Sequence, residues 1–519
     1  MRLVLAKDIF KEFKEHSVSE FFRKNASMLG YTGKIRSLTT VVHEGVTNAI
    51  DAAEEAGTLP SVFVAIRSMD EDSNHYKVVV EDNASGIPDE FIPRVFGRML
   101  AGTKLHRNVQ NRGQQGIGIS GGVMFTQATS GKPAKIITST GDDDGISYNE
   151  VMIDVNKNEG KIMDHKRLEG DWRGTRVEFE VKEVIYQRSR YGPYNYLRMT
   201  AIANPHVQIT FEEPDGSLTV FERATEEIPE EPKPIPPHPA GMRADGLLEL
   251  SKNTRSQSVG TFLVSDLSRF SRNKLEKIED MVDMDLDKDP SKLTWDEAER
   301  LVSAFRRMDF MAPPTKGLRP IGEENIERGL KQILHPDFAC AVTRSPEVYQ
   351  GGIPFIVETG LAYGGDAGDT RGSGERGLEI IRFANRAPLI FNQGGCALTS
   401  AAKDIDWRRY EVNTERTPLT LFINIVSTHV PYTSAGKQSV AEEPEVYEEV
   451  RQAVMQAARK LRRFLRKKIK RKERRERANL FEKYLPIISQ KAADLVGEDP
   501  PEVDPLIKEI AGVKNGEEK

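Results

Sequence analysis

Hydrophobic positions in the N-terminal part of the chain alternate between helical and strand-like spacing. Residues 37–56 carry apolar side chains at the spacing of an amphipathic helix, and short β-branched runs follow. These runs predict strands at 61–67, 76–81, 134–139 and 175–181. Helices interleaved with strands that bury one face predict a two-layer α+β sandwich.

A proline-rich segment at 226–241 divides the chain, because closely spaced prolines prevent helix and sheet hydrogen bonding and favour an extended spacer. The pattern beyond it is helical, then strand-like, and helical again from about residue 443. The helical stretches are expected at 247–251, 265–269, 274–284 and 294–308, and the later strands at 338–343, 354–359, 380–385 and 421–427.

The length of 519 residues exceeds what one hydrophobic core usually organises, so we expect a multidomain α/β protein. Its predicted parts are an α/β domain at 1–228, a small helical domain at 229–315, a second α/β domain with a basic C-terminal helix at 316–486, and a tail at 487–519.

The composition is that of a soluble protein. Hydrophobic residues make up 38% and charged residues 29%, and no apolar run could span a bilayer, which excludes a membrane protein. Cys340 and Cys396 are the only cysteines, which argues against a disulfide framework, and the N-terminus lacks the apolar stretch of a signal peptide. A cytoplasmic location is expected.

The net charge of −5 is unevenly distributed. Of the 19 residues at 459–477, 13 are Lys or Arg and two are acidic, so this run carries +11 and the rest of the chain −16. Apolar residues at heptad-like spacing, at positions 450, 454, 457, 461 and 464, lead into the run and predict one long helix. Such local charge is typical of contact with a polyanion or an acidic partner, although a solvated helical face stays an alternative.

A second helical feature is chemical. Glu44, Asn48 and Asp51 share one narrow face of the helix at 37–56, opposite its apolar face. An amphipathic surface helix explains this pattern by itself. A carboxylate and a carboxamide one turn apart can also activate a water molecule and complete the shell of a phosphate-bound Mg²⁺.

Two further pieces follow along the chain. Asp82 ends a β-branched run and is followed by Gly86, which fits either a turn or a carboxylate that reads an amino-bearing base. The glycine-rich segment 112–122 fits either a flexible loop or a loop whose amides wrap phosphates. A Rossmann site is excluded because no apolar strand leads into this segment, and the chain contains no Walker A sequence.

The order of these pieces is more specific than any one of them. E-x-x-x-N on a helix, D-x-x-x-G after a strand and then G-x-x-G-x-G resembles the Bergerat ATP-binding fold of the GHKL superfamily. The resemblance implies that ATP and Mg²⁺ bind here, with Glu44 as general base, Asn48 as Mg²⁺ ligand and Asp82 as the adenine reader. It further implies nucleotide contacts from Asp51, Gly86, Thr103, Lys104, Gly113, Gln114, Gln115, Gly116, Ile117, Gly118, Ile119 and Thr175. A solvated lysine is the competing interpretation of Lys104.

The second α/β domain narrows the resemblance. Its loop T-S-A-G-K-Q-S carries Lys437, which in clamp-type members reaches the γ-phosphate from a second domain. With S-V-S-E-F-F-R-K-N, P-F-I-V-E-T-G-L-A-Y-G-G and F-A-N-R-A-P-L-I-F, the chain resembles the ATPase subunits of type IIB DNA topoisomerases. That resemblance implies a helix-two-turn-helix domain, a ribosomal-S5-like transducer domain, dimerisation of the chain on ATP binding, and an A₂B₂ assembly. The assembly would pass one double-stranded DNA through another, relaxing supercoils and decatenating DNA.

DNA-facing residues are implied at two places. Trp407, Arg408, Arg409 and Tyr410 resemble a W-K-x-Y motif, with Arg in place of Lys, and Arg188 and Arg190 lie in a basic loop at 187–190. A buried aromatic residue flanked by solvated arginines stays an equal alternative for the first. Among rival functions, a MutL-like repair ATPase lacks the helical insert, and an Hsp90-like chaperone has no need of the basic helix.

Overall fold

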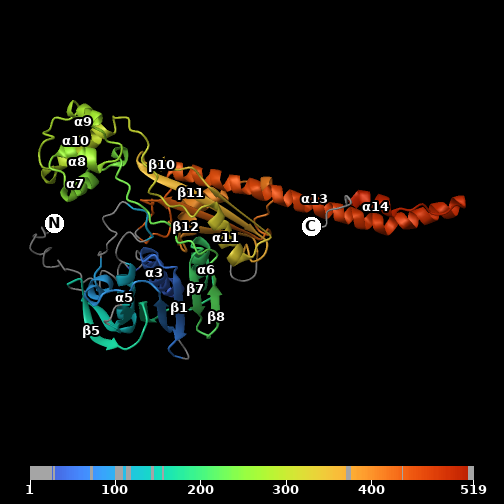
Figure 1. The fold of residues 1–519 in the computed structure, drawn as a ribbon, viewed down its shortest axis with the longest axis horizontal. Coiled ribbons are helices and arrows are strands. Elements are labelled where there is room, and N and C mark those ends of the chain that lie inside the picture. The colour runs from blue at the N-terminus through green and yellow to red at the C-terminus, as the bar shows by residue number, and fades with distance from the viewer. Residues whose placement is uncertain are drawn as a thin grey trace, which may run out of the picture.

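The computed structural model describes residues 26, 30–70, 74–99, 109–112, 118–141, 145–154, 157–369, 376–434 and 436–511. Figure 1 shows two domains built around sheets, a small helical domain, and a long helix that projects from the second sheet domain. The predicted site residues Thr103, Lys104, Gly113, Gln114, Gln115, Gly116 and Ile117 lie outside the described residues.

The described part of the first domain forms an eight-stranded sheet in the order β5-β4-β3-β6-β2-β1-β7-β8. All neighbouring pairs are antiparallel except β1 and β7. The strands are β1 (Ser61–Ser68), β2 (His75–Glu81), β3 (Ala134–Ser139), β4 (Ile146–Asp154), β5 (Glu159–Leu168), β6 (Gly174–Lys182), β7 (Gln208–Glu212) and β8 (Leu218–Phe221).

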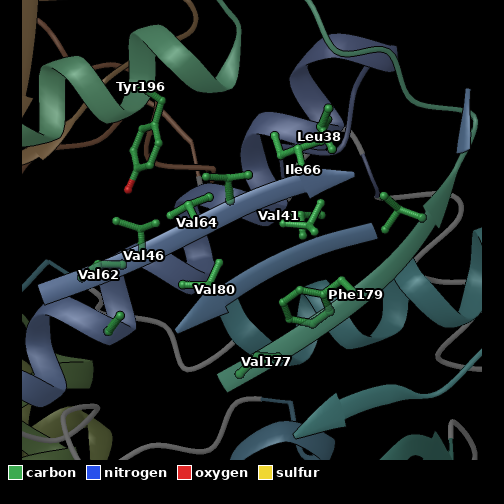
Figure 2. Packing of buried hydrophobic residues seen from close by; sticks show 14 of the residues in the cluster. Leu38, Val41, Val46, Val62, Val64, Ile66, Val80, Val177, Phe179 and Tyr196 are labelled. Atoms are coloured by element: carbon green, nitrogen blue, oxygen red, sulfur yellow. The ribbon is translucent and has the colours of Figure 1, made fainter. Parts of the chain in front are cut away.

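Helices cover one face of this sheet and confirm the predicted two layers. They are α3 (Lys34–Glu55), α4 (Ile92–Gly97), α5 (Gly118–Ser130) and α6 (Pro193–Ala203). Alternate residues of β1, Val62, Val64 and Ile66, point to the same face and meet Leu38 and Val46 of α3, as Figure 2 shows. This packing buries one side of α3 and leaves its other side for the site.

The spacer leads to a small helical domain with its own core. Its helices are α7 (Ala244–Asn253), α8 (Val259–Asp266), α9 (Arg272–Glu279) and α10 (Trp295–Phe305). The expected helix at 265–269 is wrong. Ser258 and Thr261 form a capping box that starts α8 earlier, and the chain is already extended at Leu267.

In the residues that the structure describes, the second sheet domain has six strands, ordered β10-β11-β14-β12-β13 with β9 paired to β11. The strands are β9 (Phe338–Thr343), β10 (Glu347–Tyr349), β11 (Ile353–Tyr363), β12 (Leu378–Ala384), β13 (Ala387–Pro388) and β14 (Leu419–Ser427). One core contains side chains of α11 (Glu323–Leu334) and of α6 from the first domain. Another contains those of α12 (Ala397–Lys403) and α13 (Pro444–Val496). Because both faces of β11 are covered, nearly every residue of that strand is buried.

Helix α13 is the longest element, and its N-terminal half packs on the sheet through buried residues from Val446 to Leu465. The rest extends away from the sheet, and α14 (Asp504–Ala511) lies against it (Figure 1). The expected domain limit at 486 falls inside this helix. Pro486 removes one backbone hydrogen-bond donor there, and the helix continues to Val496. Within the described part of the chain, no helix combines the length and the apolarity needed to cross a membrane.

Candidate functional site

The exposed side of α3 carries Glu44 and Asn48. The Asn48 amide nitrogen donates to the Glu44 carbonyl oxygen at 2.6 Å, which fixes the carboxamide and leaves Oδ1 as its available acceptor. The Glu44 side chain is one-quarter exposed, so it can reach a ligand without leaving its helix.

Glu44 also lies directly against the start of α5. A β-carbon at Gly118 would stand 1.9 Å from Glu44 Oε2, so no larger residue fits while the carboxylate keeps this position. The first residue of α5 and the Glu44 carboxylate therefore belong to one site. Ile119, the next predicted contact, is half-buried and packs on the core of the first domain.

A second part of the site lies where β2 ends. Asp82 is 8% exposed, and its Oδ1 accepts backbone N–H groups from Ala84 and Thr175, both at 3.0 Å. Both bonds fall on Oδ1, so Oδ2 can accept a hydrogen bond from a ligand. Burial raises the pKa of Asp82 to about 6, and the two backbone donors oppose this shift.

Two threonines and a glycine complete this part. Thr138 of β3 and Thr175 of β6 bring their hydroxyl oxygens within 3.2 Å, and Thr138 accepts the Ile87 N–H at 2.9 Å. Gly86 has a φ of +73°, and a β-carbon there would lie 2.1 Å from the Ser139 carbonyl oxygen. The backbone after β2 therefore approaches β3 as closely as only glycine allows. Sequence reasoning missed Thr138, whose only signal was its place in a predicted strand.

Lys437 enters the site from the second sheet domain. Burial lowers its pKa, while the nearby carboxylates Glu44 and Asp51 act in the opposite direction. The pKa of His43 is lowered by burial and, further, by Lys437, against the effect of Glu44. A lysine of one domain and the carboxylate of another therefore share one electrostatic environment.

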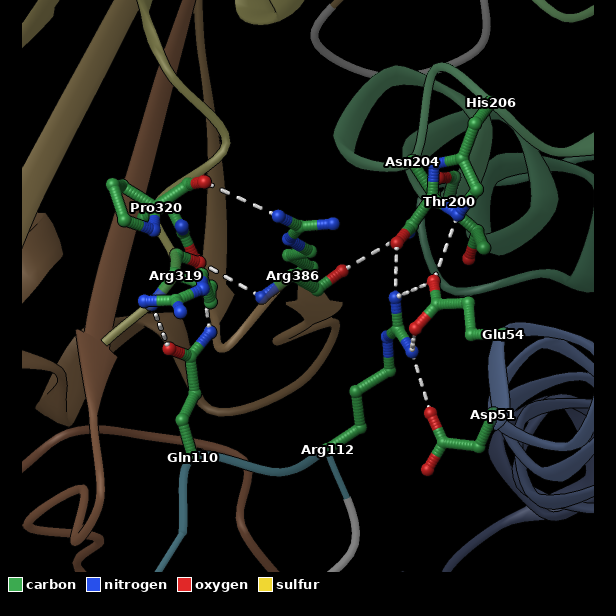
Figure 3. A network of polar contacts seen from close by, with 11 residues as sticks. Asp51, Glu54, Gln110, Arg112, Thr200, Asn204, His206, Arg319, Pro320 and Arg386 are labelled. Atoms are coloured by element: carbon green, nitrogen blue, oxygen red, sulfur yellow. Dashed lines mark hydrogen bonds and ion pairs between the residues drawn. The ribbon is translucent and has the colours of Figure 1, made fainter. Parts of the chain in front are cut away.

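Asp51 has a different neighbourhood from the one expected. It pairs with Arg112 at 2.5 Å, and the same guanidinium binds Glu54 (Figure 3). Arg112 is a site-flanking residue that sequence reasoning missed, because a pairing across some sixty residues leaves no local pattern. A nucleotide contact by Asp51 stays a prediction.

The predicted DNA-facing residues are divided by their surroundings. Arg188 pairs with Glu213 and lies over the Tyr194 ring, and Arg190 contacts Gln393 of the second sheet domain. These contacts of Arg188 and Arg190 tie the loop to its own chain.

Trp407 is 4% exposed, and its indole N–H donates to the Ala402 carbonyl oxygen at 3.0 Å. Arg408 and Arg409 beside it are exposed, and Tyr410 is partly buried against the Trp407 ring. The prediction that Trp407 offers an aromatic surface to DNA is corrected, because the ring fills the apolar core under this loop. The arginines keep the DNA-contact prediction.

Two family models match parts of the chain. Residues 33–183 match the family model of histidine kinase-, DNA gyrase B- and HSP90-like ATPases. Residues 313–477 match that of the topoisomerase VI B subunit transducer. The fold and the site thus define an ATPase of the GHKL class joined to a transducer.

Relatives cover nearly the whole chain. The B subunit of type 2 DNA topoisomerase 6 from Pyrococcus horikoshii is 51% identical over 95% of this chain and 94% of its own length. The protein of the same name from Methanothermobacter thermautotrophicus is 48% identical over 97% of both chains. The chain therefore belongs to the family of type 2 DNA topoisomerase 6 B subunits, which confirms the resemblance and decides against the MutL-like and Hsp90-like alternatives.

Proposed function

We propose that this chain is the ATP-driven gate of a type IIB DNA topoisomerase. ATP hydrolysis at the site formed by Glu44 and Lys437 drives this gate. ATP binding joins two copies of the chain around a DNA duplex. The transducer passes the resulting movement to an A subunit, which makes the double-strand break, in an A₂B₂ assembly. Passage of a duplex through that break relaxes supercoils and decatenates DNA.

The residues divide the work on ATP. Asp82 Oδ2 accepts a hydrogen bond from the adenine amino group, and Gly86 lets the ring approach the backbone. Glu44 takes a proton from the water that attacks the γ-phosphorus. Lys437 stabilises the negative charge that grows on the transferred group.

The available Asn48 Oδ1 suits Mg²⁺, which prefers oxygen ligands and is commonly shared with substrate phosphates. Bound there, the ion would neutralise phosphate charge. Asn48 would then orient the triphosphate relative to Glu44, because the amide is fixed by its own hydrogen bond to the Glu44 carbonyl.

The proposal is carried by the nearness of Lys437, from the second sheet domain, to the Glu44 and Asp51 carboxylates of the first, which oppose the lowering of its pKa by burial. A ligand between them ties the domains together. Such a site suits a protein in which ATP hydrolysis changes how two domains are joined. It is less suited to an enzyme that hydrolyses ATP without moving its domains.

Glu44→Ala should reduce ATP turnover at least about 100-fold, the low end of what a general base contributes, and leave ATP-driven dimerisation largely intact. Turnover is measured by phosphate release, and dimerisation by light scattering with a non-hydrolysable ATP analogue. Glu222→Ala removes an exposed carboxylate of the same domain and serves as the control. Parental turnover in Glu44→Ala would remove the role assigned to Glu44.

The whole proposal is tested by adding an A subunit, ATP, Mg²⁺ and supercoiled DNA. Relaxation that needs all of these components supports the gate. ATP hydrolysis that responds to neither DNA nor the A subunit would contradict it.

A further inference from the structure

Three consecutive residues, 110–112, lie between helix α3 and the second sheet domain (Figure 3). On the side of α3, Arg112 is 7% exposed and donates to Asp51 at 2.5 Å and to Glu54 at 2.7 and 2.9 Å. Asp51 and Glu54 follow Asn48 on the same helix by one and two turns. Arg112 therefore forms ion pairs with the helix that carries Glu44.

The ion pairs at this contact keep Arg112 and Glu54 charged despite their burial. Burial would raise the pKa of Glu54, but Arg112 and a hydrogen bond with His206 outweigh it and hold the pKa well below its usual range. The two carboxylates raise the pKa of Arg112 despite its burial. Separating Arg112 from its carboxylates would leave buried charges without a partner or water to solvate them. Arg112, Asp51 and Glu54 therefore move together.

On the transducer side, the same segment makes hydrogen bonds to two separate parts of the sheet domain. The Asn385 side-chain nitrogen donates to the Asn111 carbonyl oxygen at 3.0 Å. Gln110 exchanges two hydrogen bonds with the main chain of Arg319, donating to its carbonyl oxygen at 3.0 Å and accepting from its N–H at 2.7 Å.

The receiving turn is held to the end of β14 by hydrogen bonds. Asn385 and Arg386 form the two-residue turn between β12 and β13, with φ values of +49° and +70°. The Asn385 side chain also holds Ser427 at the end of β14, accepting its N–H and donating to its carbonyl oxygen, both at 2.9 Å. The chain that leaves Ser427 leads to Lys437.

We propose that residues 110–112 position α3 against the transducer and carry changes at Glu44 and Asn48 to the ends of β12 and β14. The inference rests on the proposed function, and it adds the route by which the nucleotide site reaches the transducer. Arg112, Asn111 and Gln110 are positioning residues and do not touch the reacting atoms.

Two variants cut this link at different points. Asn385→Gly keeps a residue that tolerates positive φ and removes the side-chain bond to Asn111 together with both side-chain bonds to Ser427. Gln110→Glu keeps the acceptor for the Arg319 N–H and loses the donor to its carbonyl oxygen. Neither variant replaces Glu44, Asn48 or Lys437.

The control is Arg198→Gln. Arg198 of α6 pairs with Glu379 of β12, so this change weakens the same domain interface without touching 110–112. If residues 110–112 only stabilised the interface between the domains, the control would lower strand passages per ATP as much as the two variants do.

The measurement is the number of DNA strand passages per ATP hydrolysed, in the full assembly with an A subunit, together with ATP affinity and thermal unfolding. We expect Asn385→Gly and Gln110→Glu to keep ATP affinity within about threefold and to lower strand passages per ATP at least tenfold. Arg198→Gln should keep the parental ratio.

An unchanged ratio in both variants, or an equal fall in Arg198→Gln, would overturn the inference. If one variant fails to fold, the other decides, because they alter separate residues. Should the parental assembly hydrolyse ATP without any strand passage, the proposed function itself fails, and that outcome is distinct from an unchanged ratio in the variants.

Discussion

Replacing Asp82 with Asn separates the cost of a buried charge from its use. The substitution keeps Oδ1, which accepts both backbone N–H groups, and replaces Oδ2 with an amino group. The first effect concerns the fold and the second concerns adenine, so the two can be measured independently.

The effect on the fold follows from the pKa. Burial raises the pKa of Asp82 from 3.8 to about 6 in the folded chain. A difference of about two pH units corresponds to about 3 kcal/mol of unfolding free energy. Because the folded pKa is the higher one, the protonated form favours folding: this contribution is fully present below the unfolded pKa and is lost as the pH rises through about 6.

At pH 7 the parental protein therefore carries an unfavourable buried charge that Asp82→Asn lacks. We expect the variant to be more stable at this pH by about 1 to 3 kcal/mol, since the buried amide keeps a smaller desolvation cost of its own. The advantage should shrink as the pH falls below 6. Urea unfolding of the full chain at pH 7 and pH 5 measures both.

The effect on ATP has the opposite sign. In Asp82→Asn an N–H donor faces the adenine amino donor, so a charge-assisted hydrogen bond is lost and two donors meet. The loss of about 3 kcal/mol weakens ATP binding more than about 100-fold. Calorimetric titration with ATP tests this, and Glu90→Gln, an exposed acid of the same domain, should change neither stability nor affinity. A variant that binds ATP within tenfold of the parent, or that is less stable at pH 7, would refute the reasoning.

Two further predictions concern the same site. Lys437→Met should lower ATP turnover at least about 100-fold, because the lysine charge acts on phosphate. The unfolding free energy of the variant should stay within about 1 kcal/mol of the parental value. Turnover at the parental rate in a phosphate-release assay would contradict this. Gly118→Ala and Gly86→Ala should differ in kind. The first displaces the far end of the Glu44 side chain and should reduce turnover with little change in stability. The second drives a β-carbon into the Ser139 backbone and should cost more than about 2 kcal/mol in urea unfolding. Equal stability losses in the two variants would show that the neighbours do not matter as described.

Much of the fold could be predicted where one face of an element is buried. Strands β3 and β9 match their expected limits at 134–139 and 338–343, because short runs with several apolar or β-branched residues are a local signal. Strand β5 escaped prediction because it lies at the sheet edge and most of its residues are exposed, which removes the apolar alternation.

The site shows the same division between local and distant information. Glu44, Asn48 and Gly118 were found because the motif keeps them in a fixed order along the chain. The Arg112 pair with Asp51 and Glu54, and the bond from Asn385 to Asn111, join distant segments that carry no matching pattern. Burial of Trp407 likewise depends on the core beneath its loop and not on neighbouring residues.

Helix α13 has a mechanical consequence. It spans 53 residues, and its buried positions facing the sheet end at Leu465. The following thirty or so residues extend the helix by about 45 Å at 1.5 Å per residue. A tilt of about ten degrees at the base would displace the far end by about 8 Å, so a slight reorientation of the sheet would become a larger movement at that end.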